Sequence, residues 1–174
     1  MENRITNELP RSVSSTGVVA AEVLASMSGL DVLQRIADGR LPAPPIAVLL
    51  GFRPVEIENG RAVFAATPDA RLYNPIGSVH GGYAATLLDT CMACAVHSTL
   101  KAGQGYTTVE LKVNFVRPLS ADTGEVRAEG KIIHLGRQIA TAEGRLTDAR
   151  GRLLAHATTT CLVWRLSRAE ERPA

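Results

Sequence analysis

A long apolar segment with one carboxylate inside it constrains the fold of this chain more than any other feature. The residues from Tyr83 to Val96 are apolar on nearly every face of a helix, which predicts a buried helix beginning near Gly81–Gly82. Asp89 lies within it, and an ionised carboxylate there is costly unless it is hydrogen-bonded, paired or placed at a cleft that uses its charge. The two glycines leave unpaired N–H groups at the helix N-terminus, where an anion or an oxyanion is stabilised. The segment predicts a carboxylate and an oxyanion donor that face one reacting carbonyl.

The composition bounds the size and the class of the protein. With 174 residues, of which 45% are hydrophobic and 21% charged, the chain can bury one substantial core, and its length calls for no second domain. The formal net charge of +2 and the scattered arginines give no support for nucleic acid as a partner. The sequence contains neither a GxGxxG nor a P-loop pattern, which removes support for nucleotide-dependent redox or kinase chemistry.

The three cysteines, Cys91, Cys94 and Cys161, are an odd number in a sequence without a recognisable secretory signal. We therefore expect a reducing compartment and a cytoplasmic protein. Cys91 and Cys94 have the spacing of a redox motif, but they lie inside the expected helix rather than at its N-terminus, where the helix dipole would lower a thiol pKa. Buried core thiols are the better interpretation, and no His stands at zinc-ligand spacing to complete a metal site.

Residues 1–27 are expected to form an N-terminal extension, followed by one domain at residues 28–166 and a C-terminal tail at 167–174. The first residues, to about Thr16, are polar and aperiodic, which predicts disorder. The segment from Val18 to Met27 is the one candidate for a targeting or membrane stretch. It is about half a membrane span and carries Glu22, so an amphipathic helix is favoured and no membrane partner is expected.

Turn signals divide the domain into helices and strands. Ser28 and Asp31 mark the start of a helix, and the prolines of residues 41–45 predict an extended connector after it. Residues 52–67 alternate around Asn59–Gly60, a pair suited to a two-residue type I′ hairpin turn. After the long helix, four more strands are expected at about residues 107–117, 124–135, 138–148 and 151–164.

This order of elements predicts an α+β domain in which a curved meander of antiparallel strands covers the long helix. Apolar residues alternate with polar ones along the first strand after that helix, namely Val109, Leu111, Val113 and Phe115 against Glu110, Lys112 and Asn114. Thr107 and Thr108 precede this run. Neighbouring side chains in a strand point to opposite faces, so only one of these two hydroxyls can face the helix, and the sequence leaves open which.

These features occur together in one known family. The segment from His80-Gly81-Gly82 to Asp89, followed by residues 107–118 and by Gly136-Arg137, resembles the hotdog-fold acyl-CoA thioesterases of the phenylacetate-degradation (PaaI-like) type. The similarity covers roughly residues 28–164, in the family's order and approximate spacing. It implies a single-domain hotdog fold, with a long central helix wrapped by a curved antiparallel sheet. It also implies hydrolysis of an acyl-CoA thioester to a free acid and coenzyme A, without a metal or a separate cofactor.

The resemblance also implies roles for individual residues. Asp89 matches the family's catalytic carboxylate, as a general base on water or as a nucleophile that forms a mixed anhydride. The N–H of Gly81 is the implied oxyanion donor. His80 is more often a pocket-shaping residue than a proton-transfer group. Asn74 either holds the attacking water or the thioester carbonyl, or simply forms a turn, and Thr108 matches a hydroxyl that orients water or the leaving thiolate.

Coenzyme A and a second subunit are the implied partners. The candidates for the coenzyme A phosphates are Arg117, Gly136, Arg137 and Gln138, since the guanidinium fork and the N–H groups of a glycine turn suit phosphate. Surface arginines usually bind nothing specific, which is the plain alternative. The family pairs two hotdog domains edge to edge, so we expect a homodimer or a homotetramer made of two dimers, with Asp89 of one subunit beside residues of the other.

Two other functional classes stay open. A hotdog domain can bind acyl-CoA without turnover, although the intact Asp89 and Gly81 argue against this. An acyl-CoA hydratase on the same fold would need a His after an Asp as a paired acid and base, and no His follows Asp89 closely in that pattern. The acyl group is not determined, because an apolar pocket would accept either a phenylacetyl-like or an aliphatic chain.

Overall fold

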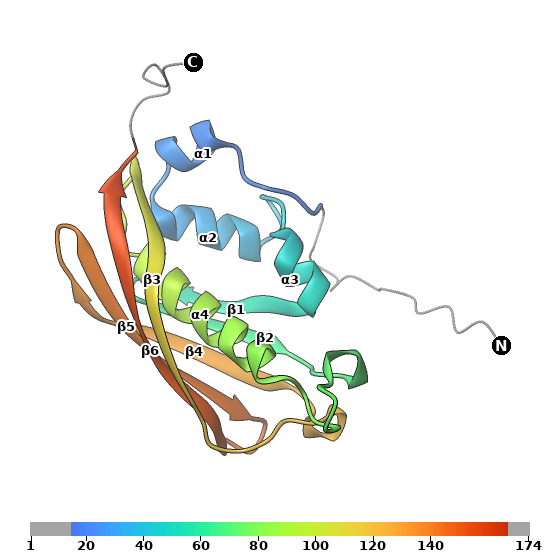
Figure 1. The fold of residues 1–174 in the computed structure, drawn as a ribbon. Coiled ribbons are helices and arrows are strands. Elements are labelled where there is room, and N and C mark those ends of the chain that lie inside the picture. The colour runs from blue at the N-terminus through green and yellow to red at the C-terminus, as the bar shows by residue number, and fades with distance from the viewer. Residues whose placement is uncertain (1–14, 167–174) are drawn as a thin grey trace.

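A six-stranded antiparallel sheet curves around one long helix in the computed structural model, which describes residues 15–166 (Figure 1). The expectations for residues 1–14 and 167–174 lie outside the described residues. The helices are α1 (Ala21–Ser26), α2 (Gly29–Ala37), α3 (Pro45–Leu50) and α4 (Gly81–His97). The strands are β1 (Phe52–Glu58), β2 (Arg61–Ala66), β3 (Gln104–Phe115), β4 (Val126–Leu135), β5 (Ile139–Asp148) and β6 (Leu153–Arg165).

The strand order is β1-β2-β4-β5-β6-β3, so the expected simple meander is wrong. Of the four strands after α4, β4, β5 and β6 are neighbours in the order of the sequence, whereas β3 pairs with β6 at the far edge of the sheet. This strand order requires a crossing connection between β3 and β4. The segment of residues 116–125 is long enough to pass the N-terminal end of α4 before β4 begins beside β2. Along this path the Val79 N–H donates to the Leu119 carbonyl at 3.0 Å, which ties the crossing segment to the residues before α4.

Two glycines let α4 lie close to the sheet. Gly130 on β4 and Gly144 on β5 are direct partners in the ladder. A Cβ at Gly130 would overlap the Cys91 carbonyl group, and one at Gly144 would lie 2.9 Å from Cγ of Met92. Because neither side chain is present, the helix backbone approaches the strands, and Met92 becomes fully buried in the core.

The helix expected from Ser28 is confirmed, and a second short helix is new. Ser28 is the N-cap of α2, where its side chain accepts from the Asp31 N–H at 3.2 Å. The proline-rich connector does not run straight into β1, since Pro45 begins α3 as its first residue and Gly51, at φ 69°, ends it. Proline at the first position and glycine after the last are known helix boundary signals.

The expected hairpin is present, but its turn is not of type I′. Glu58 pairs with Arg61 across Asn59–Gly60, so the loop has two residues as expected. Type I′ needs a positive φ at both positions, and among the described residues only glycines have one. Gly60 has a positive φ of 79°, whereas the φ of Asn59 is not positive. A positive φ at the second turn residue alone fits a type II turn.

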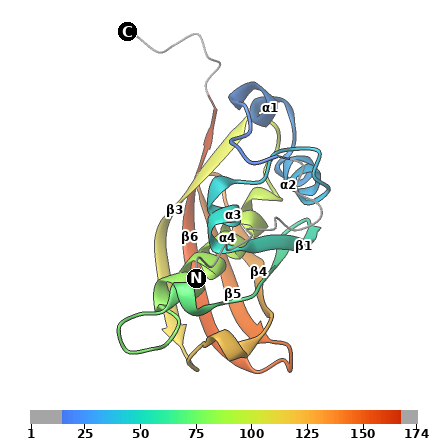
Figure 2. The same cartoon turned by 90° about the vertical axis from the view of Figure 1, so that its right-hand side faces the viewer.

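The two edges of the sheet differ in how they are protected. At the β1 edge, Pro54 lacks an N–H, a register shift follows it, and Gln34 of α2 donates to the Ile57 carbonyl at 3.3 Å. Helices α2 and α3 both contact β1 on the side of the sheet that carries α4 (Figure 2). At the other edge, no strand among residues 15–166 lies beyond β3, which exposes Val109 and Phe115, 56% and 58% accessible. The open edge of this sheet is therefore β3.

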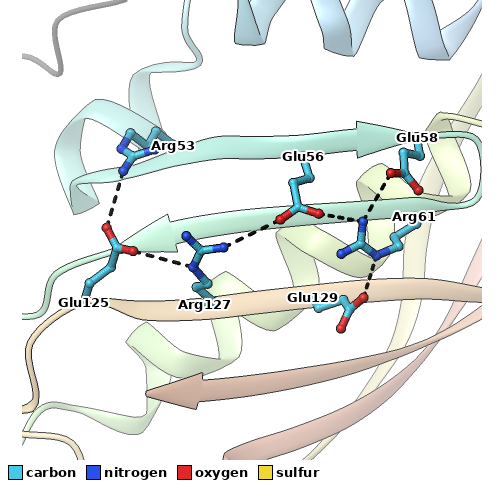
Figure 3. A network of polar contacts seen from close by, with 7 residues as sticks. All are labelled: Arg53, Glu56, Glu58, Arg61, Glu125, Arg127 and Glu129. Carbon is cyan, nitrogen blue, oxygen red and sulfur yellow. Dashed lines mark hydrogen bonds and ion pairs between the residues drawn. The ribbon is translucent and has the colours of Figure 1, made fainter. Parts of the chain in front are cut away.

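Ion pairs cover the face of β1, β2 and β4 that points away from α4 (Figure 3). Arg61 bridges Glu56, Glu58 and Glu129, and the hydrogen bond from Arg61 holds the pKa of Glu129 below its usual value. The other cations of the group also have carboxylate partners: Arg53 with Glu125, Arg127 with Glu56 and Glu125, and Lys131 with Glu129. Such largely exposed pairs add little stability. Since every cation in this group is already paired, this face is a poor candidate for binding phosphate.

The N-terminal part of the described chain forms α1, none of whose residues is buried. It falls within the segment for which an amphipathic helix was expected. Before it, the Ala43 N–H donates to the Ser15 carbonyl at 2.9 Å and the Gly17 N–H to the Ala43 carbonyl at 3.0 Å. Within residues 15–166, no helix has the length and hydropathy needed to span a membrane.

Candidate active site

Asp89 and Thr108 meet between α4 and the β3 edge. Thr108 Oγ1 donates to Asp89 Oδ1 at 2.9 Å, and both side chains are only partly buried. Asp89 Oδ2 has no hydrogen-bond partner among residues 15–166. The open choice between the two threonines is thereby decided, because Thr107 is exposed on the other face. One carboxylate oxygen is held by a hydroxyl while the other is available to a water or a carbonyl carbon.

A β-bulge aims Thr108 at the helix. Thr108 lies opposite Cys161 and Glu110 opposite Thr160, so Val109 is an extra residue in β3 without a partner of its own. Uninterrupted alternation from Val109 backward would have turned Thr107 toward the helix and Thr108 away from it. The inserted residue reverses this, and the sequence pattern carried no signal of it.

Protonated thiols surround the carboxylate. Burial raises the pKa of Cys94 to about 12, and it raises the pKa of Cys91 and Cys161 above the usual thiol value, with the Asp89 charge adding to each shift. The interpretation of Cys91 and Cys94 as core thiols thus agrees with the structure, and all three cysteines are free. Among the described residues no cluster of three or more His, Cys, Asp or Glu could hold a metal ion.

A pocket of about 310 Å³ opens at the N-terminus of α4. Its wall includes Asn74, His80, Gly81, Phe115 and Arg117. Gly81 is the first residue of the helix, and its N–H has no acceptor among the hydrogen bonds of residues 15–166. A Cβ at Gly81 would lie 3.1 Å from Cζ of Phe115, so the glycine also makes room for that ring. The sequence placed Phe115 only among the alternating apolar residues of its strand, and its position in this pocket was not predicted.

His80 is the N-cap of α4. Its Nδ1 accepts a hydrogen bond from the Gly82 N–H at 2.9 Å, which satisfies one of the free amides of the first turn. With Nδ1 acting as an acceptor, a neutral ring carries its proton on Nε2. The imidazole therefore caps the start of the helix, and its expected role in the pocket stays a prediction.

Asn74 shapes the loop before the helix. Its Oδ1 accepts from the N–H groups of Ile76 and Ser78 at 3.1 and 3.2 Å, and its Nδ2 donates to Ser78 Oγ at 3.1 Å. These bonds are those of a local turn, which was the plain alternative for this residue. Asn74 does line the pocket, but its contact with a water or a thioester carbonyl stays a prediction.

The two halves of the expected chemistry are far apart in one protomer. Gly81 and Asp89 are eight residues apart on α4, which corresponds to about 12 Å along the helix axis. A single carbonyl cannot touch both the Gly81 N–H and the Asp89 carboxylate at that separation. Within one protomer, therefore, Gly81 and Asp89 cannot act on the same carbonyl.

The residues expected to bind phosphate are also divided. Arg117 lies in the wall of the Gly81 pocket, where its Nη1 donates to the Leu153 carbonyl at 2.6 Å. The turn at residues 136–138 is at the other end of the sheet, because Phe115 pairs with Ala155 whereas Ile139 pairs with Leu162. Seven strand residues separate these levels, roughly 23 Å. The turn containing Gly136, Arg137 and Gln138 is instead close to the level of Thr108, and both side chains after the glycine are exposed.

Comparisons with known proteins identify the family of the chain. The family model described as thioesterase superfamily matches residues 76–155. The proofreading thioesterase EntH of Klebsiella pneumoniae is 35% identical over 103 residues, 59% of this chain and 74% of EntH. The 1,4-dihydroxy-2-naphthoyl-CoA hydrolase of Listeria monocytogenes is 25% identical over 114 residues, 66% of this chain and 91% of the hydrolase. A Ralstonia eutropha structure described as a phenylacetic acid degradation-related thioesterase has a TM-score of 0.68 at 30% identity, covering 75% of this chain and 98% of that one. The expected α+β hotdog fold is confirmed, and the chain belongs to the thioesterase superfamily as a hotdog-fold thioesterase of the phenylacetate-degradation type.

Proposed function

We propose that this thioesterase hydrolyses an acyl-CoA thioester, with Asp89 as its catalytic carboxylate and the Gly81 N–H as its oxyanion donor. The hydrogen bond from Thr108 to Asp89 carries the proposal, because it fixes one carboxylate oxygen and leaves the other without a partner among the described residues. Because Asp89 is only partly buried, this second oxygen can meet a water or a substrate that enters between α4 and β3.

In the proposed reaction, water adds to the thioester carbonyl and the C–S bond breaks. Asp89 Oδ2 takes a proton from the water and returns it to the coenzyme A sulfur, which leaves as a thiol. If Asp89 attacks the carbonyl carbon instead, the C–S bond breaks, coenzyme A leaves as the thiolate and takes up a proton, and the mixed anhydride that forms is cleaved by water in a second step. In either case the carbonyl oxygen gains negative charge, which the Gly81 N–H and the positive end of the α4 dipole stabilise. Neither route requires a metal or a cofactor.

The complete site is proposed to form between two copies of the chain. About 12 Å separates Gly81 from Asp89 in one protomer, but two copies paired antiparallel along their β3 edges can bring Asp89 of one to Gly81 of the other. The unpaired β3 edge, with its exposed Val109 and Phe115, supports this pairing, whereas the β1 edge is blocked. A homodimer is thus the smallest active unit, and a tetramer would join two of them.

Replacing Asp89 tests the catalytic assignment. Asp89→Asn keeps the size of the side chain but cannot act as a base or nucleophile, so kcat should fall by about a hundredfold or more. The assay follows free thiol released from a panel of aromatic and aliphatic acyl-CoA esters, and Asp122→Asn, at an exposed carboxylate, is the matched control. If Asp89→Asn retains kcat within about threefold of the parent, Asp89 is structural and the proposal is wrong.

Mixed dimers test the shared site. Gly81→Pro removes the N–H at a helix position where proline is tolerated, and His80, at ψ 135°, has the backbone that a following proline requires. Dimers formed from Asp89→Asn and Gly81→Pro chains would contain one intact site in every mixed pair. After random exchange, about a quarter of the parental activity should return. No recovery, despite mixed dimers detected by mass spectrometry, would place both groups of a working site in one chain.

The same thiol assay separates the alternative functions. A hydratase consumes the enoyl double bond without releasing thiol, and a non-catalytic binding protein releases none from any ester.

The choice of acyl group to test first follows from a relative, since the Listeria enzyme is named for an aromatic acyl-CoA. We therefore propose an aromatic acyl group as the first to test. The cytoplasm stays the expected compartment, because all three cysteines are free.

A further inference from the structure

We infer that Thr159, a residue outside the catalytic pair, positions Thr108 and through it Asp89; this inference rests on the proposed function. Thr159 lies on the inner face of β6 and is 1% accessible. Its Oγ1 donates to the backbone carbonyl of Glu110 on β3 at 2.7 Å. Glu110 immediately follows Val109, the extra residue of the bulge. The hydroxyl therefore bonds the β3 backbone at the point where the strand departs from its regular ladder.

A buried threonine at this place needs the hydrogen bond to be favourable. Valine has almost the same shape and suits a β-strand equally well, but it lacks the hydroxyl. A hydroxyl buried without a partner is unfavourable, whereas one that satisfies a backbone carbonyl is not. A bulge interrupts the regular ladder hydrogen bonds, so a side-chain donor from the neighbouring strand compensates for that interruption. Thr159 supplies such a donor from inside the core.

The neighbouring contacts link the Thr159 hydrogen bond to Thr108 and Asp89. Cys161 follows Thr159 by two residues on the same face of β6 and is the ladder partner of Thr108. Cys161 Sγ lies 4.0 Å from Thr108 Oγ1; burial raises the pKa of this thiol, while Thr108 and Thr159 both act in the opposite direction. On the outer face, Thr160 Oγ1 donates to the Glu110 carboxylate at 3.3 Å in an exposed contact. The inner bond is the buried one.

The geometry of the bulge determines which threonine faces Asp89. With Val109 unpaired, Thr108 points inward and bonds Asp89 at 2.9 Å. If the bulge loosened or shifted by one residue, the hydroxyl of Thr108 would turn away from the helix. A misplacement of about 1 Å at a catalytic group can cost up to a hundredfold in rate. Thr159 acts on the rate by holding this backbone, without touching substrate.

The test compares three variants at the neighbouring inner and outer positions. Thr159→Val should lower kcat about tenfold with KM changed less than twofold, because substrate contacts stay in place. Thr159→Ser keeps the hydroxyl and should stay within about threefold of the parent. Thr158→Val, on the exposed outer face of the same strand, is the matched control and should retain parental kcat. The parent chain's own thiol release, measured alongside, tests the proposed function separately from these effects.

A double-mutant cycle separates positioning from a general loss of stability. Thr108→Val removes the hydroxyl that Thr159 is inferred to aim, so adding Thr159→Val to it should change kcat less than twofold. If the second substitution lowers kcat tenfold in both backgrounds, Thr159 acts independently of Thr108 and the inference is wrong. An unchanged kcat in Thr159→Val would equally overturn it. Should Thr159→Val not fold, Thr159→Cys takes its place; its thiol is a weaker donor, so its kcat should be lower than that of Thr159→Ser, and an equal or higher kcat would overturn the inference.

Discussion

Placing a methyl group between α4 and the sheet, by Gly130→Ala, should cost both stability and activity. A Cβ at Gly130 would lie 2.6 Å from the Met92 backbone N and closer still to the Cys91 carbonyl, whereas ordinary contact begins at 3.4 Å. The atoms on both sides belong to backbone, so no side chain can rotate out of the way. The helix must therefore move away from β4 by about 1 Å or the strand must bend.

The size of the effect follows from this displacement. Overpacking a core costs about 1–3 kcal/mol, and the rigid backbone on both sides favours the upper end. The ordinary gain of up to about 1 kcal/mol from replacing glycine by alanine offsets part of it. A net loss of about 2 kcal/mol would lower the Tm of a chain of this length by about 4–8 °C. Asp89 precedes Cys91 by two residues on α4, so the same movement separates it from Thr108, and kcat should fall by about tenfold or more.

Gly144→Ala is the matched control, because the new methyl there meets the flexible side chain of Met92 rather than backbone. It should cost less stability than Gly130→Ala and leave kcat nearly unchanged, because a side chain can shift where backbone cannot. Urea unfolding at equal protein concentration measures the free energy of unfolding, and thiol release measures kcat. Equal effects of the two substitutions on both quantities would refute the close approach of α4 to β4 as the cause.

Three further substitutions probe other parts of the molecule. Burial lowers the pKa of His97 to about 4 from an ordinary 6.5, so the unfolded chain binds a proton in this window that the folded one does not. The free energy of unfolding should then decrease by up to about 3 kcal/mol as pH falls from 6.5 to 4, and His97→Phe should remove that part of the decrease in urea titrations across this range. The hydroxyl of Tyr83 is buried without a partner among the described residues, so Tyr83→Phe should leave stability unchanged or raise it by up to about 1 kcal/mol; a clear loss in the melting temperature would mean the hydroxyl is bonded. Arg137→Glu should raise KM for acyl-CoA far more than it lowers kcat, while thioesters lacking the nucleotide should not respond; an unchanged KM would move the phosphate site toward Arg117.

Local sequence signals were sufficient for the helices that depend on them. Residues 83–96 are apolar on nearly all sides, and this predicts a buried α4 wherever the sheet lies. Ser28 and Asp31 start α2 through bonds between near neighbours in the chain. The short helix α3 was missed although Pro45 and Gly51 mark its ends, because six residues contain too little periodicity to stand out.

Strand order and the distances between site residues needed the tertiary structure. The sequence of residues 107–117 does not determine whether β3 pairs with β4 or with β6, since either pairing satisfies the same alternation of apolar and polar residues. Placing β3 at the far edge leaves that edge unpaired among the described residues and puts Arg117 at the opposite end of the sheet from the turn at residues 136–138. The sequence motif joined Gly81 and Asp89 in one site, and helix geometry separates them by about 12 Å in one chain.

By itself, the sequence determined the buried helix and the position of its carboxylate, because both depend on residues close together in the chain, and it determined the family through the order and spacing of short motifs. It could not determine which threonine meets that carboxylate. The period of two along β3 is regular in the sequence, and a single inserted residue, Val109, reverses the faces on either side of it. That insertion is defined by the pairing with β6, where Thr159 bonds the displaced backbone. A contact between residues some fifty positions apart is what aims Thr108 at Asp89, and such a contact exists only once the sheet has formed.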